Sequence, residues 1–285
     1  MTPKNKKDIQ ARPFLKWVGG KAQLLSQFEQ YYPKDFNNYL EPFIGGGAVF
    51  FNMNPTKAHI NDVNVTLISA YKNIKNKPEE IMKILKKLEN EYRKNDIEGQ
   101  SELFYKIREQ FNGLSDDELK KSAYLIFLNK TCFNGMYREN SKGGFNTPFG
   151  KYKNPTILDQ DNILRVSEVL KNTKLTSVSF DKAVADAKKG DFVYFDPPYH
   201  PLNKTTAKFT SYHKDSFTEE DQLKLRDVFV ELDKRGCYLM LSNSYTPFID
   251  DIYKKYRRET VMANRAINCK ATGRGKIKEL LILNY

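Results

Sequence analysis

The sequence predicts an α/β fold in which a largely parallel sheet carries an inserted, mostly helical domain. Three observations support this prediction. A short apolar run at residues 192–195 is stopped by two prolines, as expected for a buried strand of a parallel sheet. A glycine-rich turn at residues 45–47 lies between an apolar strand pattern and the start of a helix. Between them, from about residue 70 to residue 158, the sequence is charged and helical.

The composition describes a soluble globular protein with an excess of positive charge. Of its 285 residues, 40% are hydrophobic and 29% are charged, and the formal net charge is +12. An excess of this sign favours polyanions through contacts with phosphate, although many basic proteins bind no nucleic acid. The sequence shows neither an apolar run long enough to span a bilayer nor a signal peptide, so we expect no membrane partner.

Cysteine and histidine usage bears on metal binding and on the cellular compartment. The three cysteines show no Cys-x-x-Cys spacing, and the three histidines form no recognisable ligand motif. We therefore expect no metal site and no disulfide scaffold, and we expect a cytoplasmic protein.

The first element along the chain surrounds the only tryptophan, Trp17. The Gly-Gly pair at residues 19–20 breaks the chain, and a helix is predicted for residues 21–29. Lys16 and Lys21 flank the indole ring. A tryptophan beside such a turn is more often part of the core, but this arrangement also suits an adenosine ring and a carboxylate.

Residues 39–51 are typical of a strand, a glycine turn and the start of a helix. Gly45 and Gly47 allow the backbone to approach a ligand closely. Phe50 occupies the place of the third glycine of the dinucleotide fingerprint, so a nicotinamide dinucleotide is the less favoured ligand. Asp62 ends a second short strand, at the position of the usual partner of a ribose hydroxyl. Together these features predict an adenosine-type cofactor.

Two helices are predicted within the charged region. Apolar residues recur at helical spacing from Pro78 to about Arg93, as in an amphipathic helix. Ser115 and Glu118 have the spacing of a capping box, which predicts a helix that continues to Leu128. Both apolar stripes are typical of packing faces.

The end of the insert, at residues 131–153, is a loop in which aromatic residues alternate with Asn, Gly, Arg and Lys. Arg and Asn side chains can pair with guanine and adenine edges, and apolar groups can touch a thymine methyl. Phe133 can fill the space left by an extruded base. A mobile basic surface loop is the alternative. The loop lies in the sequence between the glycine turn and the segment described next, and this position favours DNA recognition.

The segment with the most specific chemistry is residues 196–199, directly after the buried strand. Ligands bind beyond the carboxyl ends of the strands in open α/β sheets. Pro197 and Pro198 each hold the preceding residue extended, so the carboxylate of Asp196 and the carbonyl of Pro197 can point into one pocket beside the Tyr199 ring. Two acceptors and a ring suit a planar exocyclic amine. A turn that merely ends a strand is the alternative for this tetrapeptide alone.

The α/β pattern continues to the end of the chain. We expect a helix from Thr218 to near Gly236, a buried strand at residues 238–243, a helix from Pro247 to about Tyr256 and a last strand at residues 280–283.

Together these segments resemble the Dam-like family of DNA N6-adenine methyltransferases, which methylate GATC. The matching segments span nearly the whole chain and comprise residues 14–21, 41–47, 134–138, 145–150, 196–199 and 273–276. Their order, with the glycine turn first, the recognition insert second and Asp-Pro-Pro-Tyr last, is similar to the α group of amino-methyltransferases. Asp-Pro-Pro-Tyr alone is shared with other amino-methyltransferases, whereas six motifs in one order are specific.

The resemblance implies a Rossmann-like S-adenosylmethionine-dependent methyltransferase sheet formed by residues 1–69 and 159–285, with a target-recognition domain at residues 70–158. It also implies S-adenosylmethionine as the cofactor. The cofactor-binding positions are Trp17, Lys21, Phe43, Gly45, Gly47, Asp62 and Asp196.

The resemblance further implies double-stranded DNA as substrate and a flipped adenine held by the catalytic set Asp196, Pro197, Pro198 and Tyr199. The DNA-binding positions are Lys16, Phe133, Asn134, Met136, Arg138 and Pro148. The lysine and the arginine hold guanine-reading positions, and the methionine and the proline lie beside thymine methyls. The asparagine contacts the surroundings of the flipped base, and the phenylalanine inserts into the duplex. The family often has a tyrosine at this last position, so a hydrogen bond from its hydroxyl is lost here.

Two other functions stay open at this point. One is an N-methyltransferase that acts on RNA or on a protein glutamine amide, although the basic aromatic loop would be superfluous for a glutamine substrate. The other is a non-catalytic DNA-binding protein on the same fold, which the intact segment 196–199 and the glycine turn argue against. We also expect a monomer, with a cognate restriction endonuclease for the same DNA site as a candidate partner.

Overall fold

The computed structural model describes residues 10–202, 217–264 and 276–285, which divide into two compact units. Unit 1 comprises the described residues up to Gly20 together with Gly45–Asn54 and Asn64–Thr173. Unit 2 comprises Lys21–Ile44, Pro55–Val63 and the described residues from Lys174 onwards. This division follows contacts within the chain. The division by role, with a target-recognition domain at residues 70–158, stays a prediction.

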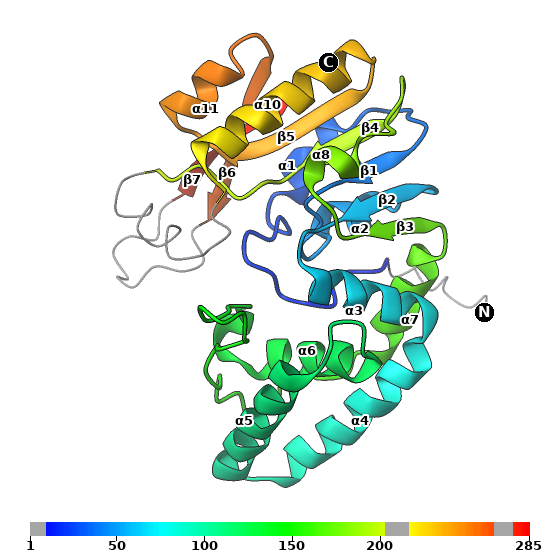
Figure 1. The fold of residues 1–285 in the computed structure, drawn as a ribbon, viewed down its shortest axis with the longest axis vertical. Coiled ribbons are helices and arrows are strands. Elements are labelled where there is room, and N and C mark those ends of the chain that lie inside the picture. The colour runs from blue at the N-terminus through cyan, green and yellow to red at the C-terminus, as the bar shows by residue number, and fades with distance from the viewer. Residues whose placement is uncertain (1–9, 203–216, 265–275) are drawn as a thin grey trace, which may run out of the picture. The chain divides into compact units, whose positions relative to one another are not determined.

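Unit 2 is built on a sheet whose described strands follow the order β3-β2-β1-β4-β5-β7-β6 (Figure 1). The strands are β1 (Tyr39–Glu41), β2 (Ala58–Asn61), β3 (Thr173–Thr176), β4 (Phe192–Phe195), β5 (Tyr238–Ser244), β6 (Arg257–Asn264) and β7 (Lys276–Leu283). β1 pairs in parallel with β2 and β4, and β4 pairs in parallel with β5. β7 runs antiparallel to both β5 and β6. The predicted α/β class is confirmed.

β4 is buried on both faces, as its continuous apolar sequence predicts. Val193 and Phe195 join a core with α8 (Phe180–Ala183), α10 (Glu219–Lys234) and α11 (Pro247–Ile252). The alternate residues Phe192 and Tyr194 face the opposite side. There the rings of Tyr32, Phe36 and Phe28 pack against them, with centroid distances of 5.7–6.4 Å. Because every side chain of the strand is buried, the residue that follows it is held in a defined position.

The other helices of unit 2 partly follow the prediction. α10 begins at a capping box in which Thr218 and Asp221 bond reciprocally, close to the predicted start. The helix predicted at residues 21–29 is wrong in length, because residues 22–24 form a turn and α1 comprises only Leu25–Phe28, followed by the 3-10 turn η1 (Glu29–Tyr31). α11 ends at Ile252 rather than near Tyr256, since Tyr253 and Tyr256 turn to pack against Phe229 of α10.

Unit 1 is helical in its described part. Its elements are α2 (Ala48–Met53), α3 (Val65–Asn76), α4 (Pro78–Lys94), α5 (Ile97–Gly113), α6 (Leu119–Thr131), the 3-10 turn η2 (Phe133–Gly135) and α7 (Gln160–Leu170). α4 has the predicted start and buries the apolar face that contains Ile81, Leu85 and Leu88. α6 packs against α3, α4 and α5, so it is buried on most sides.

The predicted capping box of α6 is wrong. The Ser115 backbone N–H and hydroxyl both bond to the Glu118 carboxylate, at 2.9 and 3.1 Å, and close a turn before the helix. The helix itself begins at Leu119, after Glu118, whose side chain makes no capping bond. It continues beyond the predicted end at Leu128 to Thr131.

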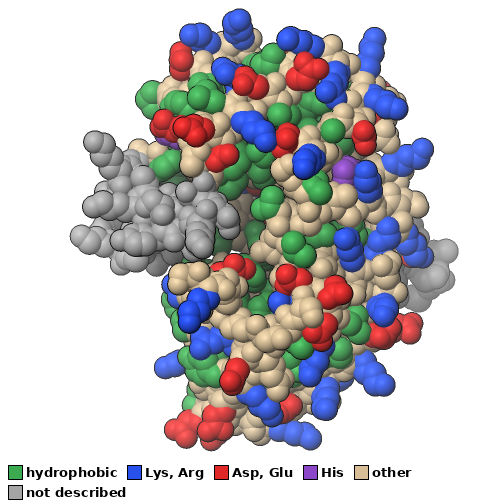
Figure 2. Space-filling model, in the orientation of Figure 1, with side chains coloured by type: hydrophobic (Ala, Val, Ile, Leu, Met, Phe, Trp, Pro, Cys, Tyr) green, Lys and Arg blue, Asp and Glu red, His purple; other side chains and the backbone are tan. Residues whose placement is uncertain are grey.

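Within the residues that the structure describes, none of the helices combines the length and the apolar character needed to span a bilayer. Figure 2 shows Lys and Arg side chains spread over the visible face and interspersed with Asp and Glu. Positive charge alone therefore does not mark a single DNA-binding patch on this face.

The half-buried His59 of β2 predicts a pH dependence of stability. A ring nitrogen of His59 lies 2.7 Å from the Thr176 hydroxyl, and burial together with Lys174 lowers the pKa of His59 from 6.5 to about 4. Between these pH values the unfolded chain binds a proton that the folded protein does not, so stability falls as the pH drops from about 6.5 towards about 4.

We expect the variant His59→Gln to lose this component of the pH dependence. Urea unfolding of both proteins at about pH 7 and about pH 5 measures it. Equal slopes of unfolding free energy against pH would show that His59 titrates alike in the folded and unfolded chains.

Candidate functional site

Asp196 directly follows β4 and is the centre of a polar cluster in unit 2. Its Oδ1 atom accepts from the Lys21 ammonium at 2.8 Å and from the Ser242 hydroxyl at 2.9 Å. The Tyr194 hydroxyl lies 2.9 Å from Ser242 Oγ and donates to it, since the serine proton is given to Asp196. The Lys21 side chain is 6% exposed and that of Asp196 is 18% exposed, so water screens this ion pair little. The contacts fix the orientation of the carboxylate.

These contacts occupy one carboxylate oxygen. In the part of the chain that the structure describes, neither Oδ2 of Asp196 nor the Pro197 carbonyl has a protein hydrogen-bond partner. The Pro198 carbonyl, in contrast, accepts from Gln222 Nε2 at 2.9 Å. Two acceptors on adjacent residues are thus without a described protein donor, and their role in binding a ligand stays a prediction.

Tyr199 is held at both ends of its side chain. The Lys21 ammonium lies over the ring, 4.6 Å from its centroid, and the hydroxyl donates to Glu279 Oε2 at 2.6 Å. Burial raises the pKa of Tyr199 well above its usual value, and nearby Asp196 and Glu279 add to this, so the hydroxyl stays protonated and donates. Burial also raises the pKa of Glu279, while the bond from Tyr199 opposes that rise.

Glu279 is a site residue that the sequence did not predict. It pairs with Ser244 in the β5–β7 ladder. Because β7 is antiparallel, its early residues lie at the edge where the parallel strands end, and a residue before an apolar run can reach the site. Ser242 and Asn243 lie near the end of the buried strand β5, and such polar residues after an apolar run were a signal of the same kind.

The resemblance predicts methyl transfer at this cluster. On that prediction we expect the variant Glu279→Gln to lower kcat about fivefold, because the charge-assisted hydrogen bond that Glu279 accepts from Tyr199 becomes a neutral one. Steady-state methylation assays of Glu279→Gln, Tyr199→Phe and the double variant measure this. Glu279→Gln weakens this bond and Tyr199→Phe removes it, so the double variant should lose little more than Tyr199→Phe alone. Fully additive losses would show that Glu279 acts independently of the tyrosine hydroxyl.

Trp17 and the glycine turn come together in unit 1. The indole stacks on Tyr137, with centroids 5.1 Å apart and an interplanar angle of 21°. A Cβ atom at Gly45, where φ is +46°, would lie 2.8 Å from Trp17 Cδ1. The Tyr71 hydroxyl donates to the Gly45 carbonyl at 3.1 Å, and a Cβ atom at Gly47 would lie 2.8 Å from that hydroxyl. Packing therefore requires glycine at both positions.

The remaining predicted cofactor residues belong to unit 2. Phe43 stacks on Phe180 with centroids 5.4 Å apart, so part of its ring serves the core. Asp62 follows β2 directly, and its backbone N–H donates to the Thr176 carbonyl. The strand ends at Asn61, next to the predicted end, and the role of the Asp62 carboxylate stays a prediction.

The predicted recognition loop has a defined backbone in unit 1. Antiparallel bridges join Cys132 to Phe149 and Glu139 to Phe145. Lys16 is tied to this loop by the buried Asn129, which accepts from the Lys16 N–H at 2.8 Å and donates to both the Lys16 and the Gly135 carbonyls, at 2.8 and 2.9 Å. Sequence analysis missed Asn129, which lies inside an apolar helix.

Six predicted DNA-binding residues are thus gathered in unit 1, and most of their side chains are exposed. The exposed ones are Lys16, Phe133, Asn134, Arg138 and Pro148, whereas Met136 is half-buried. Phe133 is 52% exposed, which is unusual for its size and leaves the ring available to stack. Arg138 is oriented by Asn146, whose side-chain oxygen accepts from Nε at 2.8 Å. The last motif of the predicted set, residues 273–276, has side chains outside the described residues.

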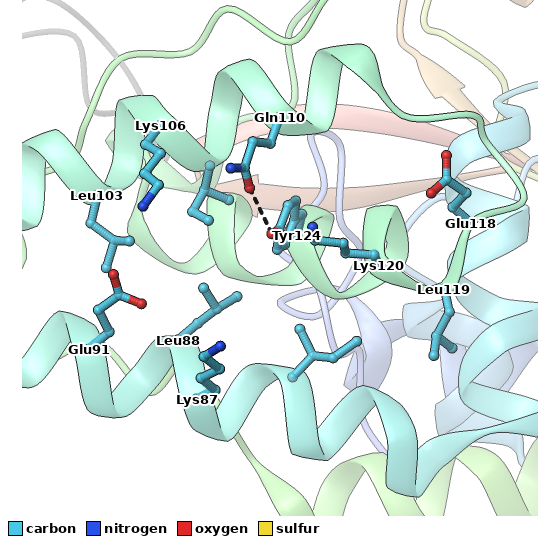
Figure 3. A pocket seen from close by; sticks show the side chains of 12 residues that line it. Lys87, Leu88, Glu91, Leu103, Lys106, Gln110, Glu118, Leu119, Lys120 and Tyr124 are labelled. Carbon is cyan, nitrogen blue, oxygen red and sulfur yellow. Dashed lines mark hydrogen bonds between the residues drawn. The ribbon is translucent and has the colours of Figure 1, made fainter.

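A separate hollow of about 620 Å³ lies among α4, α5 and α6 (Figure 3). Leu88, Leu103 and Tyr124 contribute to its lining, and the Tyr124 hydroxyl donates to Gln110 at 2.9 Å. None of the predicted site residues lines this hollow. It is therefore distinct from the polar cluster at Asp196.

Comparison with known proteins gives a consistent result. Residues 17–267 match the family of D12 class N6 adenine-specific DNA methyltransferases. The chain is 46% identical over 290 residues to the type II methyltransferase M.MjaIII of Methanocaldococcus jannaschii. The alignment covers 97% of this chain and 100% of the relative. It is 44% identical to the type II methyltransferase M1.LlaDCHI of Lactococcus lactis, with 98% of each chain covered. It is 34% identical to the DNA adenine methylase of Escherichia coli K12, with 95% of each covered.

Proposed function

We propose a specific activity for this chain, which belongs to the D12 class of N6 adenine-specific DNA methyltransferases. It methylates adenine in the sequence GATC, and S-adenosylmethionine is the methyl donor. Action on adenine in DNA follows from the family. The donor and the GATC sequence are the finer part of the proposal. They are supported by the motif resemblance and by relatives named DNA adenine methylase.

The observation that carries the chemical part is the pair of available acceptors at Asp196 and Pro197. An adenine amine has two N–H bonds, and Asp196 Oδ2 and the Pro197 carbonyl can accept one each. Lys21 and Ser242 hold Oδ1, so the carboxylate is already oriented before substrate binds. Preorganised acceptors of this kind stabilise the positive charge that develops on the amine nitrogen.

The catalytic step follows from these contacts. The two acceptors draw the N6 protons away from the base, which localises the nitrogen lone pair towards a methyl group held in line. Transfer would form the N6–carbon bond as the sulfur–carbon bond of the donor breaks. The donor would leave as a neutral thioether, and the methylated amine would release one proton to solvent. Tyr199 stacks on the base and fixes its plane, while the buried surroundings limit access of water. Holding both reactants in near-attack geometry supplies much of the rate enhancement.

The residues present fit S-adenosylmethionine. Trp17 offers an aromatic face, the glycine turn brings backbone N–H groups close to a ligand, and Asp62 offers a carboxylate for ribose hydroxyls. We propose that Lys21, Phe43, Gly45, Gly47 and Asp196 complete this set. When bound, S-adenosylmethionine would supply an activated methyl group on a sulfonium centre.

We propose that the loop of unit 1 reads the DNA. Arg138 and Lys16 pair with guanines, and Met136 and Pro148 contact thymine methyls. The exposed Phe133 occupies the space of the extruded adenine, and Asn134 contacts its surroundings. In this proposal residues 70–158 form the target-recognition domain, and residues 1–69 and 159–285 form the catalytic domain.

The biological setting is also part of the proposal. Two relatives are named type II methyltransferases, which supports a cognate restriction endonuclease that cuts the same site. We propose a cytoplasmic enzyme that works as a monomer on double-stranded DNA.

The test is methyl transfer from labelled S-adenosylmethionine to a duplex with one GATC, compared with a matched duplex that contains GTAC. We expect label only in the first duplex, recovered as N6-methyladenine. Label in both would reject GATC as the recognition sequence while keeping the adenine chemistry. No label in either, with other adenine-containing duplexes also unlabelled, would reject the proposed donor and substrate together.

A further inference from the structure

Two buried amide side chains lie behind the Asp-Pro-Pro-Tyr segment. Asn243, in β5, is fully buried, and Gln222, in α10, is 1% exposed. Asn243 Nδ2 donates to Gln222 Oε1 at 3.1 Å. A helix and a strand that are distant in the sequence are thus joined at the end of the sheet that carries Asp196.

The amide pair reaches the backbone on both sides of Tyr199. Gln222 Nε2 donates to the Pro198 carbonyl at 2.9 Å, immediately before the tyrosine. Asn243 Oδ1 accepts from the His200 N–H at 3.0 Å, immediately after it. The Ser244 hydroxyl also donates to the His200 carbonyl.

The orientation of both amides is determined by their partners. Asn243 Oδ1 accepts from two backbone N–H groups, those of His200 and Ser244, so its amino group must point to Gln222. The Gln222 oxygen is then occupied, and only its amino group can meet the Pro198 carbonyl. Because both amides are buried, loss of either leaves unsatisfied polar groups in the core.

We propose that Gln222 and Asn243 are positioning residues for methyl transfer. They clamp the two peptide groups that flank Tyr199, and they occupy the Pro198 carbonyl, so that the neighbouring Pro197 carbonyl is the one presented to the target amine. Neither side chain needs to touch the substrate. This inference rests on the proposed roles of Tyr199 and Pro197.

The test uses two variants of one residue. Gln222→Glu keeps the shape and the acceptor for Asn243 but places a carboxylate oxygen against the Pro198 carbonyl. Gln222→Met keeps the approximate volume and removes the amide without adding a charge. It replaces Gln222→Glu in the test if the buried carboxylate prevents folding. We expect either variant to lower kcat by about tenfold to a hundredfold, since small misplacement of reacting groups has effects of this size. The dissociation constant for S-adenosylmethionine should not change.

A structural role alone would not change the state of the target base. We therefore expect a GATC duplex with 2-aminopurine in place of the target adenine to give a weaker or different fluorescence change with the Gln222 variants than with the unmodified protein. The matched control is Asn284→Ala. The Asn284 amide also joins α10 to β5, because it bonds to Asp233 of α10, to the Cys237 carbonyl and to the Leu239 N–H of β5. It lies at the other end of that strand.

The outcomes separate the clamp from the proposed function. Gln222 variants that lose kcat and the base signal, beside an Asn284→Ala protein that loses only thermal stability, support the clamp. Equal losses of kcat in the Gln222 variants and in Asn284→Ala would overturn the clamp, because the losses would then reflect lower stability in general. Tyr199→Ala is the reference: if it loses the signal while the Gln222 variants keep theirs, the clamp alone is wrong. If Tyr199→Ala itself keeps full activity, the proposed role of Tyr199 fails first.

Discussion

Replacement of Asp196 by Asn is expected to lower kcat for methyl transfer by about a hundredfold to a thousandfold. The variant should still fold and bind DNA. Lys21 and Ser242 both donate to Oδ1, so the asparagine oxygen will take that place and the new amino group will occupy the position of Oδ2. An acceptor for the adenine amine is thereby turned into a donor that opposes it. Single-turnover assays with saturating duplex and donor measure the effect.

The control for this substitution is Asp191→Asn at the other end of β4. Asp191 is also buried, and its oxygens accept from the Asn38 N–H at 3.1 Å and the Lys188 N–H at 2.8 Å. It should lose stability comparably without loss of kcat. Alanine at position 196 is the less informative change, because it removes a carboxylate that pairs with the buried Lys21 ammonium and can destabilise the fold. Near-normal turnover by a folded Asp196→Asn protein would contradict the catalytic assignment.

Local patterns account for the elements that the sequence predicted well. The apolar run of β4, the glycine turn before α2, and the starts of α4 and α10 are each determined by neighbouring residues. β6 was missed because it begins with the charged run Arg257, Arg258 and Glu259, and because among the described strands it is an edge strand beside β7. The start of α6 was misplaced because the spacing of Ser115 and Glu118 fits a closed turn as well as a helix cap.

The candidate site shows the same limit. Asp196, the prolines and Tyr199 form one contiguous motif, which the sequence reveals directly. Glu279 and Gln222 reach that motif only through strand pairing and helix packing. Glu279 is 80 residues from its partner Tyr199 in sequence, and Gln222 is 24 residues from its partner Pro198. Their spacing carries no information until the antiparallel register of β7 is known. Sequence reasoning therefore found the groups proposed to touch substrate and missed the groups that position them.

Replacement of Arg138 by Ala is expected to relax base choice at one position of the recognition sequence, at a cost of about 1–3 kcal/mol for the cognate base pair. The guanidinium is exposed. Asn146 accepts from its Nε at 2.8 Å through the side-chain oxygen and from Nη2 at 3.4 Å through the main-chain carbonyl. The Nη1 amino group and the second N–H of Nη2 remain for a bidentate pair with guanine. Methylation rates on GATC and on duplexes with each single substitution of the guanines measure the change.

The matched control for Arg138 is Lys142→Ala, which removes one exposed positive charge from the same loop. A charge that contacts phosphate contributes to binding on every sequence, so this variant should weaken all duplexes alike and reduce the salt dependence. Asn146→Ala should reproduce part of the Arg138 effect, because it removes the side-chain bond that orients Nε without removing charge. If Arg138→Ala behaves as Lys142→Ala does, Arg138 contacts the DNA backbone, and the guanine is read by another residue of the loop.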